Sequence, residues 1–162
     1  MQPLPTYAQA LEASLAITKA TTVVESVSLQ EASNRILAND IVADRDFPPF
    51  HRSQMDGYAV LAQEIEEGVS MEVVGQVSAG STFEGEHETK TCVAIATGAP
   101  VPHCFDAVVP HEQTDSGEQQ VVLNCESVHS GAYIHPQGVD AKAGEVLVGT
   151  NTTLKPQHLA IA

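Results

Sequence analysis

The amino-acid sequence predicts a mainly β protein with a few helices (α+β), and two features of the chain point to this class. Between residues 46 and 136, short apolar segments alternate with glycine, proline and Asp-Ser-Gly turns, as in a mainly antiparallel β unit. Helical signals are confined to the two ends of the chain. The 162 residues, 43% of them apolar, are enough for one ordinary domain or two small ones with a buried core.

Two capping boxes near the N-terminus predict helices over residues 6–19 and 28–39. In each box a hydroxyl residue stands three positions before a Gln or Glu. These pairs are Thr6 with Gln9 and Ser28 with Glu31. Apolar residues follow the first box at helical spacing, so we expect that stripe to belong to the core. A brief strand is expected at 41–43, before two prolines break the chain.

Beyond this break, several short apolar segments are typical of strands bounded by turns. The predicted strands are 58–60, 71–77, 91–96, 107–109, 121–123 and 145–150. The last residues, from Leu154 onward, begin a helical pattern with Pro156 in its first turn. The pattern stops without a cap, which favours a fragment of something longer.

The charge balance and the cysteines exclude several classes of protein. The net charge is −14 and no basic stripe is present, so neither nucleic acid nor an anionic membrane surface is an expected partner. No signal peptide and no apolar run of membrane-spanning length is visible. Three widely spaced cysteines, Cys92, Cys104 and Cys125, predict reduced, partly buried thiols. We therefore expect a cytoplasmic protein.

Three short oxygen-bearing side chains are the candidate site residues. Asp56 lies in the polar loop after the prolines, Thr97 precedes Gly98, and Asp140 follows Gly138 closely. Such groups suit Mg²⁺ with a mostly hydrated shell, or hydrogen bonds to ligand hydroxyls. Each can equally be a turn-stabilising residue, and Asp56 before glycine is also a hairpin signal. Only convergence in space separates these alternatives.

The sequence supports neither a zinc-protease site nor a Ser-His-Asp catalytic triad. His111 and Glu112 begin a zinc-protease pattern, but Asp115 stands where the second histidine belongs. Ser53 has a histidine and an aspartate nearby, yet no Gly-x-Ser-x-Gly elbow occurs in the chain.

Three motifs occur in order along the chain and carry a resemblance to a known family. They are MDGYA after a Pro-Pro-Phe loop, TGAPVP followed by DAVVPHEQT, and GVDAKAG. The set resembles the N-terminal part of the molybdopterin molybdenumtransferase family, the MoeA-like proteins to which the gephyrin E-domain also belongs. The resemblance runs from the first predicted helix to Leu159. It implies insertion of molybdenum from molybdate into adenylylated molybdopterin, with release of AMP.

The resemblance also implies a domain organisation. Residues 1–45 and 137–162 are expected to form a discontinuous, elongated domain I, and 46–136 an inserted β-rich domain II. By the resemblance, the family's α/β pterin-binding domain and its C-terminal β domain are expected to lie outside these 162 residues. Family members are homodimers whose active site is a cleft shared between subunits, so this segment is expected to contribute one wall.

By the same resemblance, Asp56, Thr97 and Asp140 match positions associated with catalysis. Arg52 and Ser53 are flanking substrate-binding candidates, and the two aspartates are the expected Mg²⁺ ligands.

The sequence departs from the family pattern mainly by losing charged residues. His51 and Val139 stand where family members often have Asp and Glu. Basic residues near Pro136 and Gln137, and an arginine before the TGAP motif, are missing.

Three hypotheses follow from these observations. The first is a transferase segment that is inactive by itself, and the second is a non-catalytic dimerisation or scaffold module. The third, an unrelated metal-dependent hydrolase using Asp56 and Asp140, lacks a visible nucleophile.

Overall fold

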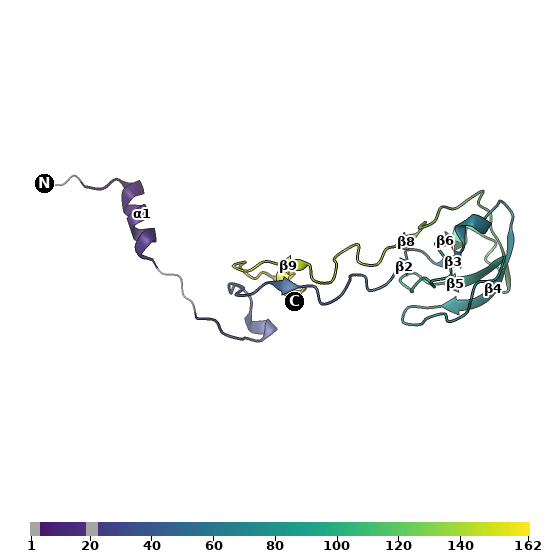
Figure 1. Ribbon diagram of the computed structural model, residues 1–162, viewed down its shortest axis with the longest axis horizontal. Coiled ribbons are helices and arrows are strands. Elements are labelled where there is room, and N and C mark those ends of the chain that lie inside the picture. The colour runs from purple at the N-terminus through teal and green to yellow at the C-terminus, as the bar shows by residue number, and fades with distance from the viewer. Residues whose placement is uncertain (1–3, 19–22) are drawn as a thin grey trace. The chain divides into compact units, whose positions relative to one another are not determined.

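The computed structural model describes residues 4–18 and 23–162, and the described residues form two units (Figure 1). The first unit takes its residues from 1–39 and 150–162, and the second is 40–149. The described residues contain two α-helices and nine short strands, which confirms the mainly β class. The domain boundaries predicted from the sequence, after residue 45 and before residue 137, stay a prediction.

Helix α1 (Tyr7–Ile17) begins at the predicted capping box. The Thr6 hydroxyl accepts the backbone N–H of Gln9 (3.3 Å), and the Gln9 side chain accepts that of Thr6 (2.9 Å). The expectation that its apolar stripe belongs to the core is wrong for this chain, because no α1 residue is buried and Leu15 is 64% exposed. No helix among the described residues is long and apolar enough to cross a membrane.

The predicted helix over 28–39 is wrong, since only a single 3-10 turn forms at Leu29–Glu31. The Ser28 hydroxyl donates to the Glu31 carboxylate (2.8 Å) and caps no backbone N–H. Asn34 then adopts a left-handed conformation (φ 64°), and Ile36 pairs with Thr153. Bonding to the C-terminal segment therefore replaces the expected helix. The last predicted helix is present as α2 (Pro156–Leu159).

A five-stranded sheet dominates the second unit (Figure 1). Its order is β6-β3-β5-β4-β7. The strands are β3 (Gly57–Val60), β4 (Ser70–Val77), β5 (Thr91–Ile95), β6 (Ala107–Pro110) and β7 (Gln120–Val122). All neighbours are antiparallel except β4 and β5, so the predicted mainly antiparallel character is confirmed. Two smaller ribbons pair β1 (Ile41–Val42) with β9 (Val146–Val148) and β2 (Arg52–Ser53) with β8 (Ile134–His135).

Strands β3, β5 and β6 of the five-stranded sheet are buried on both faces. Tyr58 and Val60 of β3 belong to one apolar cluster, while Ala59 between them belongs to a second cluster. The same alternation separates Val109 from Val108 in β6. Strands covered on both faces are apolar at every position. This is why these segments are continuous apolar runs in the sequence.

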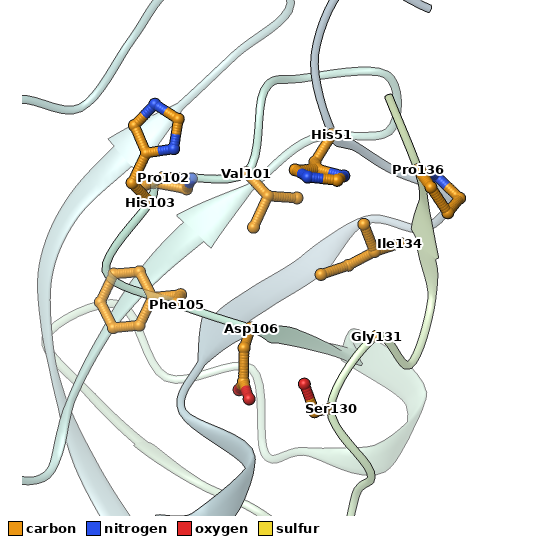
Figure 2. Close-up of a pocket in the computed structure, with 10 residues that line it drawn as sticks. All are labelled: His51, Val101, Pro102, His103, Phe105, Asp106, Ser130, Gly131, Ile134 and Pro136. Carbon is orange, nitrogen blue, oxygen red and sulfur yellow. The ribbon is translucent and has the colours of Figure 1, made fainter. Parts of the chain in front are cut away.

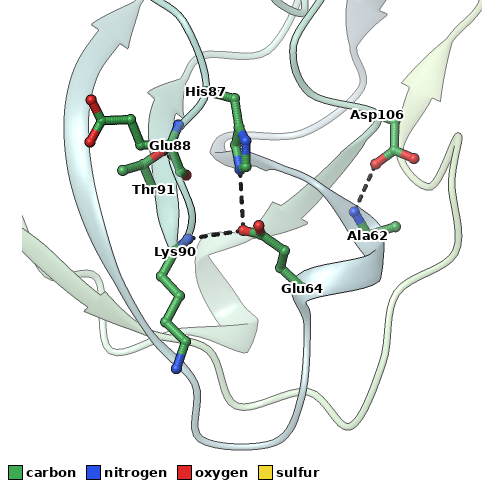
Figure 3. A network of polar contacts seen from close by, with 7 residues as sticks. All are labelled: Ala62, Glu64, His87, Glu88, Lys90, Thr91 and Asp106. Carbon is green, nitrogen blue, oxygen red and sulfur yellow. Dashed lines mark hydrogen bonds and ion pairs between the residues drawn. The ribbon is translucent and has the colours of Figure 1, made fainter.

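The parallel pair β4 and β5 requires a long connection, which residues 78–90 supply. Polar contacts join the end of this connection to the 3-10 helix Ala62–Glu64 (Figure 3). The Glu64 carboxylate accepts the backbone N–H of Lys90 (3.0 Å) and lies 3.2 Å from Nε2 of His87. The Glu64 and His87 side chains are each 16% exposed, so the contact between them is partly shielded from solvent.

The three cysteines are free, as predicted. Cys92 is buried in the sheet, and burial raises the pKa of its thiol to about 12. The thiol therefore stays protonated near neutral pH and behaves as a core side chain.

Candidate functional site

Strand β2 is hydrogen-bonded to other segments on both sides, and these bonds position the residues of the candidate site. On one side Arg52 pairs with His135 of β8. On the other side Ser53 donates its backbone N–H to Ala99 (2.9 Å) and accepts that of Gly98 (2.8 Å). An open pocket of about 270 Å³ forms where these segments meet. It is lined by Arg52, Ser53, Gln54, Thr97, Gly98 and His135.

Asp56 and Thr97 are brought together at this pocket. Oδ1 of Asp56 accepts both the backbone N–H (2.7 Å) and the hydroxyl (3.0 Å) of Thr97. The backbone bond, and after it the hydroxyl bond, holds the pKa of the Asp56 carboxyl below its ordinary value. The carboxylate is exposed and ionised at neutral pH, so the pair presents a fixed negative charge at the rim of the pocket.

Position 57 has room only for glycine, because strands β3 and β6 approach closely at this point. A Cβ atom at Gly57 would lie 2.1 Å from the carbonyl oxygen of Val109 in β6. The Asp-Gly pair is not a hairpin turn, since β2 pairs with β8 while β3 pairs with β5 and β6. The hairpin alternative is therefore wrong.

Ser53 and Arg52 contribute to the pocket in different ways. The Ser53 side chain is buried, and its hydroxyl donates to the Met55 carbonyl (2.6 Å) and accepts the Met55 backbone N–H (3.3 Å). Its observed hydrogen bonds therefore order the turn that leads to Asp56. Arg52 is exposed and lines the pocket, where a guanidinium group suits an oxyanion or phosphate.

Asp140 lies beside the pocket-lining His135. Both carboxylate oxygens of Asp140 are 3.3 Å from Nε2 of His135, and its backbone N–H donates to Phe47 (2.9 Å). Of the five residues singled out in the sequence, three line the pocket directly. Asp56 and Asp140 each contact a residue that lines it.

His135 and Gln54 are pocket residues that sequence reasoning missed. In the sequence, His135 was one of seven histidines with no metal-binding spacing. Its only local signal was Asp140, five residues later and beyond a proline and a glycine. Its pairing with Arg52 depends on strands far apart in the chain.

The residues present could supply Mg²⁺ with only part of a ligand set. Within residues 4–18 and 23–162, no group of three or more His, Cys, Asp or Glu side chains is arranged to hold a metal. Oδ2 of Asp56 receives no hydrogen bond from that part of the chain, so it is available to a ligand. Mg²⁺ commonly takes one or two carboxylates and completes its shell with water and substrate phosphates. Asp56 suits that role.

The fold and the pocket define a class of protein: a mainly β unit with a small, open, polar pocket beside the β2–β8 ribbon. Residues 5–162 match the family described as the MoeA N-terminal region (domain I and II). The chain belongs to this family.

Named relatives agree with this membership. A molybdopterin molybdenumtransferase of Haemophilus influenzae is 36% identical over 86% of this chain, and one of Synechococcus elongatus is 32% identical over 96%. The crystal structure of a molybdopterin biosynthesis MoeA protein from Pyrococcus horikoshii matches 98% of the chain with a TM-score of 0.90 and 32% identity. The chain spans 35%, 40% and 43% of the lengths of these three proteins.

Proposed function

We propose that this chain is the N-terminal part of a molybdopterin molybdenumtransferase and contributes one wall of its active site. The reaction inserts molybdenum from molybdate into adenylylated molybdopterin and releases AMP. The observation that carries the proposal is the Asp56–Thr97 pair at a pocket lined by Arg52 and His135, in a chain that belongs to this family.

Each side chain has a role that its contacts support. Thr97 donates its hydroxyl hydrogen to Asp56, so the lone pairs of Oγ1 would be available to a ligand donor. Asp56 and Asp140 would supply carboxylate oxygens to Mg²⁺, which when bound neutralises phosphate charge on the adenylylated substrate. Arg52 would hold a phosphate or molybdate oxygen. The Asp140 carboxylate keeps the His135 ring at the pocket.

The net charge of −14 opposes the approach of anionic substrates to this chain alone. We therefore infer that the cationic groups of the complete site come mainly from other domains. Free thiols and an acidic chain fit a cytoplasmic enzyme that binds neither nucleic acid nor membrane.

We further propose that the protein is a homodimer and that helix α1 contributes to the interface. Tyr7, Leu11 and Leu15 recur every four residues along one side of α1, and all three are exposed. A second copy of the chain is the partner that would cover this stripe.

Leu11→Asp is expected to weaken self-association by at least about tenfold, because it places a charge in the apolar stripe. Ala13→Asp is the matched control, since it adds the same charge on the opposite side of the same helix. Sedimentation velocity across a range of protein concentrations measures both. Equal dimerisation of the two variants would remove α1 from the interface.

The proposed activity is tested with a chimera in which this chain replaces the matching N-terminal region of the Haemophilus influenzae relative. Adenylylated molybdopterin, molybdate and Mg²⁺ should yield molybdenum cofactor with the chimera and none with the 162-residue chain alone. A folded, dimeric but inactive chimera would favour the alternative, a non-catalytic dimerisation or scaffold module. The absence of the family's basic residues near Pro136 and Gln137 is the observation that keeps this alternative open.

A further inference from the structure

A second pocket lies on the opposite face of the β2–β8 ribbon. Ile134 and His135 are consecutive in β8, and consecutive strand side chains point to opposite faces. His135 lines the candidate site, whereas Ile134 lines this second pocket. Its volume is about 390 Å³, within the range of roughly 300–1,000 Å³ that is usual for small-molecule sites. The two pockets share no lining residue.

The middle of the second pocket is an apolar wall. Val101 and Phe105 are buried members of a core cluster, and Ile134 packs against the same cluster (Figure 2). The Phe105 ring also meets the His87 ring edge-on, with ring centroids 5.6 Å apart. The wall is therefore a fixed apolar surface. It favours a flat ring over a flexible chain, because a rigid ligand loses less conformational entropy on binding.

One end of the pocket carries a carboxylate. Asp106 and Ser130 lie together at the lower end of the view in Figure 2. Oδ1 of Asp106 accepts the backbone N–H of Ala62 (2.7 Å), which fixes the orientation of the carboxylate. No hydrogen bond from the described part of the chain reaches Oδ2. This oxygen is therefore available to a donor group of a ligand.

The 3-10 helix Ala62–Glu64 supports the pocket at two points (Figure 3). The backbone N–H of its first residue holds the Asp106 carboxylate. The carboxylate of its last residue lies 3.2 Å from Nε2 of His87, whose ring packs against Phe105. One short element thus fixes both the charged end and the apolar wall, so the pocket is preorganised for a ligand.

The charge at the pocket favours a cation. None of the described residues that line it is Lys or Arg, so no basic side chain of the lining accompanies Asp106. The net charge of −14 also attracts cations to the chain at long range. An ammonium group at Oδ2 forms a charge-assisted hydrogen bond, which is stronger than a bond between neutral groups. The carboxylate end therefore selects an organic cation over a neutral or anionic ligand.

The other end offers a hydrogen-bond donor. Nδ1 of His51 lies 3.1 Å from the backbone nitrogen of Gln137 and accepts its N–H. A neutral His51 ring must then carry its proton on Nε2, so it can donate to an oxygen of a ligand. His51 and His103 lie at the upper end of the view, away from Asp106 (Figure 2).

We propose that this second pocket binds an arylalkylamine, an aromatic ring with an ammonium group on a short aliphatic arm and an acceptor oxygen on its far side. The ammonium group pairs with Asp106, the ring lies against the apolar wall, and the oxygen accepts the Nε2 proton of His51. The donor and the carboxylate are at opposite ends of the pocket, so the apolar body of the ligand separates its two polar groups. The site uses none of the residues of the proposed transferase site, so its test is independent of that activity.

Binding is tested by titrating the ¹⁵N-labelled chain with tyramine, which has all three features. We expect saturable shifts of the Phe105 and Gly131 amide signals, with a Kd of about 1 mM or tighter. No saturable shift of these signals at millimolar concentration would overturn the proposal.

Three further probes each lack one feature of tyramine. 4-Ethylphenol lacks the ammonium group, and butylamine, which corresponds to the end of a lysine side chain, lacks the ring. Each should bind at least about tenfold more weakly than tyramine. 2-Phenylethylamine lacks only the oxygen and should bind severalfold more weakly. Equal affinities for 4-ethylphenol and tyramine would refute the selection of a cation. Tighter binding of butylamine than of tyramine would overturn the aromatic ligand in favour of a lysine side chain from a partner protein.

Asp106→Asn separates ligand binding from folding. Its amide oxygen can still accept the Ala62 N–H, whereas its NH₂ group opposes the donors of the ammonium group. We expect affinity for tyramine to fall by about tenfold or more, while affinity for 4-ethylphenol stays the same. Asp44→Asn is the matched control, because it removes the same charge at an exposed position outside the pocket. A folded Asp106→Asn protein that binds tyramine as tightly as the Asp44→Asn protein would refute the site.

His51→Phe tests the donor end while keeping a ring at the rim. It should weaken tyramine binding severalfold, because the donor to the phenolic oxygen is lost. Binding of 2-phenylethylamine, which has no such oxygen, should stay the same and shows that the pocket is intact. Unchanged tyramine binding by His51→Phe would refute the assignment of the donor end.

Discussion

Asp56→Asn is expected to reduce cofactor formation by the chimera about a hundredfold while leaving its stability nearly unchanged. The Asn side-chain oxygen can still accept the Thr97 backbone N–H and hydroxyl, so the turn that both residues shape should persist. What the variant loses is the negative charge, which is the property a Mg²⁺ ligand or a phosphate-positioning group requires.

The measurement compares the rate of cofactor formation and the melting temperature of the variant with those of the parent chimera. Asp44→Asn serves as a control, because Asp44 is exposed and outside the pocket. Normal activity of Asp56→Asn would show that Asp56 only orders the turn. A large drop in melting temperature would assign it to folding.

Gly57→Ala is expected to destabilise the 162-residue chain by about 3 kcal/mol, at the upper end of ordinary overpacking. The added methyl group would meet the Val109 carbonyl oxygen at 2.1 Å and the Pro110 Cα at 2.9 Å. Both atoms belong to the backbone of β6, so no side chain can rotate away. Relief requires β3 and β6 to separate, and that exposes the apolar cluster on each face of the sheet.

Gly149→Ala is the matched control for this prediction. No atom lies within 4 Å of a Cβ at Gly149, and its φ is not in the left-handed region. Its free energy of unfolding should change by less than about 1 kcal/mol. Urea unfolding followed by circular dichroism measures both variants. Similar midpoints for the two would contradict the close approach of β3 and β6 at Gly57.

The sequence predicted the elements whose determinants lie within a few residues of one another. The Thr6–Gln9 capping box starts α1 as expected, and Pro156 opens α2. Strands β3, β5 and β6 were visible as apolar runs because their side chains are buried on both faces of the sheet. The same kind of local signal failed at Ser28 and Glu31, where pairing of Ile36 with Thr153 competes with helix formation.

The candidate site was only partly visible in the sequence. Motif order drew attention to Asp56, Thr97 and Asp140, but each side chain alone was indistinguishable from a turn residue. The structure shows that Asp56 and Thr97 meet through two hydrogen bonds, which also order the turn they share. Their roles in catalysis, and that of Asp140, stay predictions. The pocket itself required β2 and β8, two-residue strands too short to leave a periodic pattern.

The sequence alone therefore determined the class of fold, the buried strands β3, β5 and β6, and the terminal helices, because backbone propensity and apolar periodicity act over a few neighbouring residues. The tertiary structure decided which segments pair, that Gly57 is needed for close approach of β6, and that His135 reaches the pocket beside Arg52. It also left the α1 stripe uncovered by the described residues of this chain. These outcomes depend on the free energy of contacts between segments far apart in the chain. Local sequence patterns do not specify which of those segments will pair.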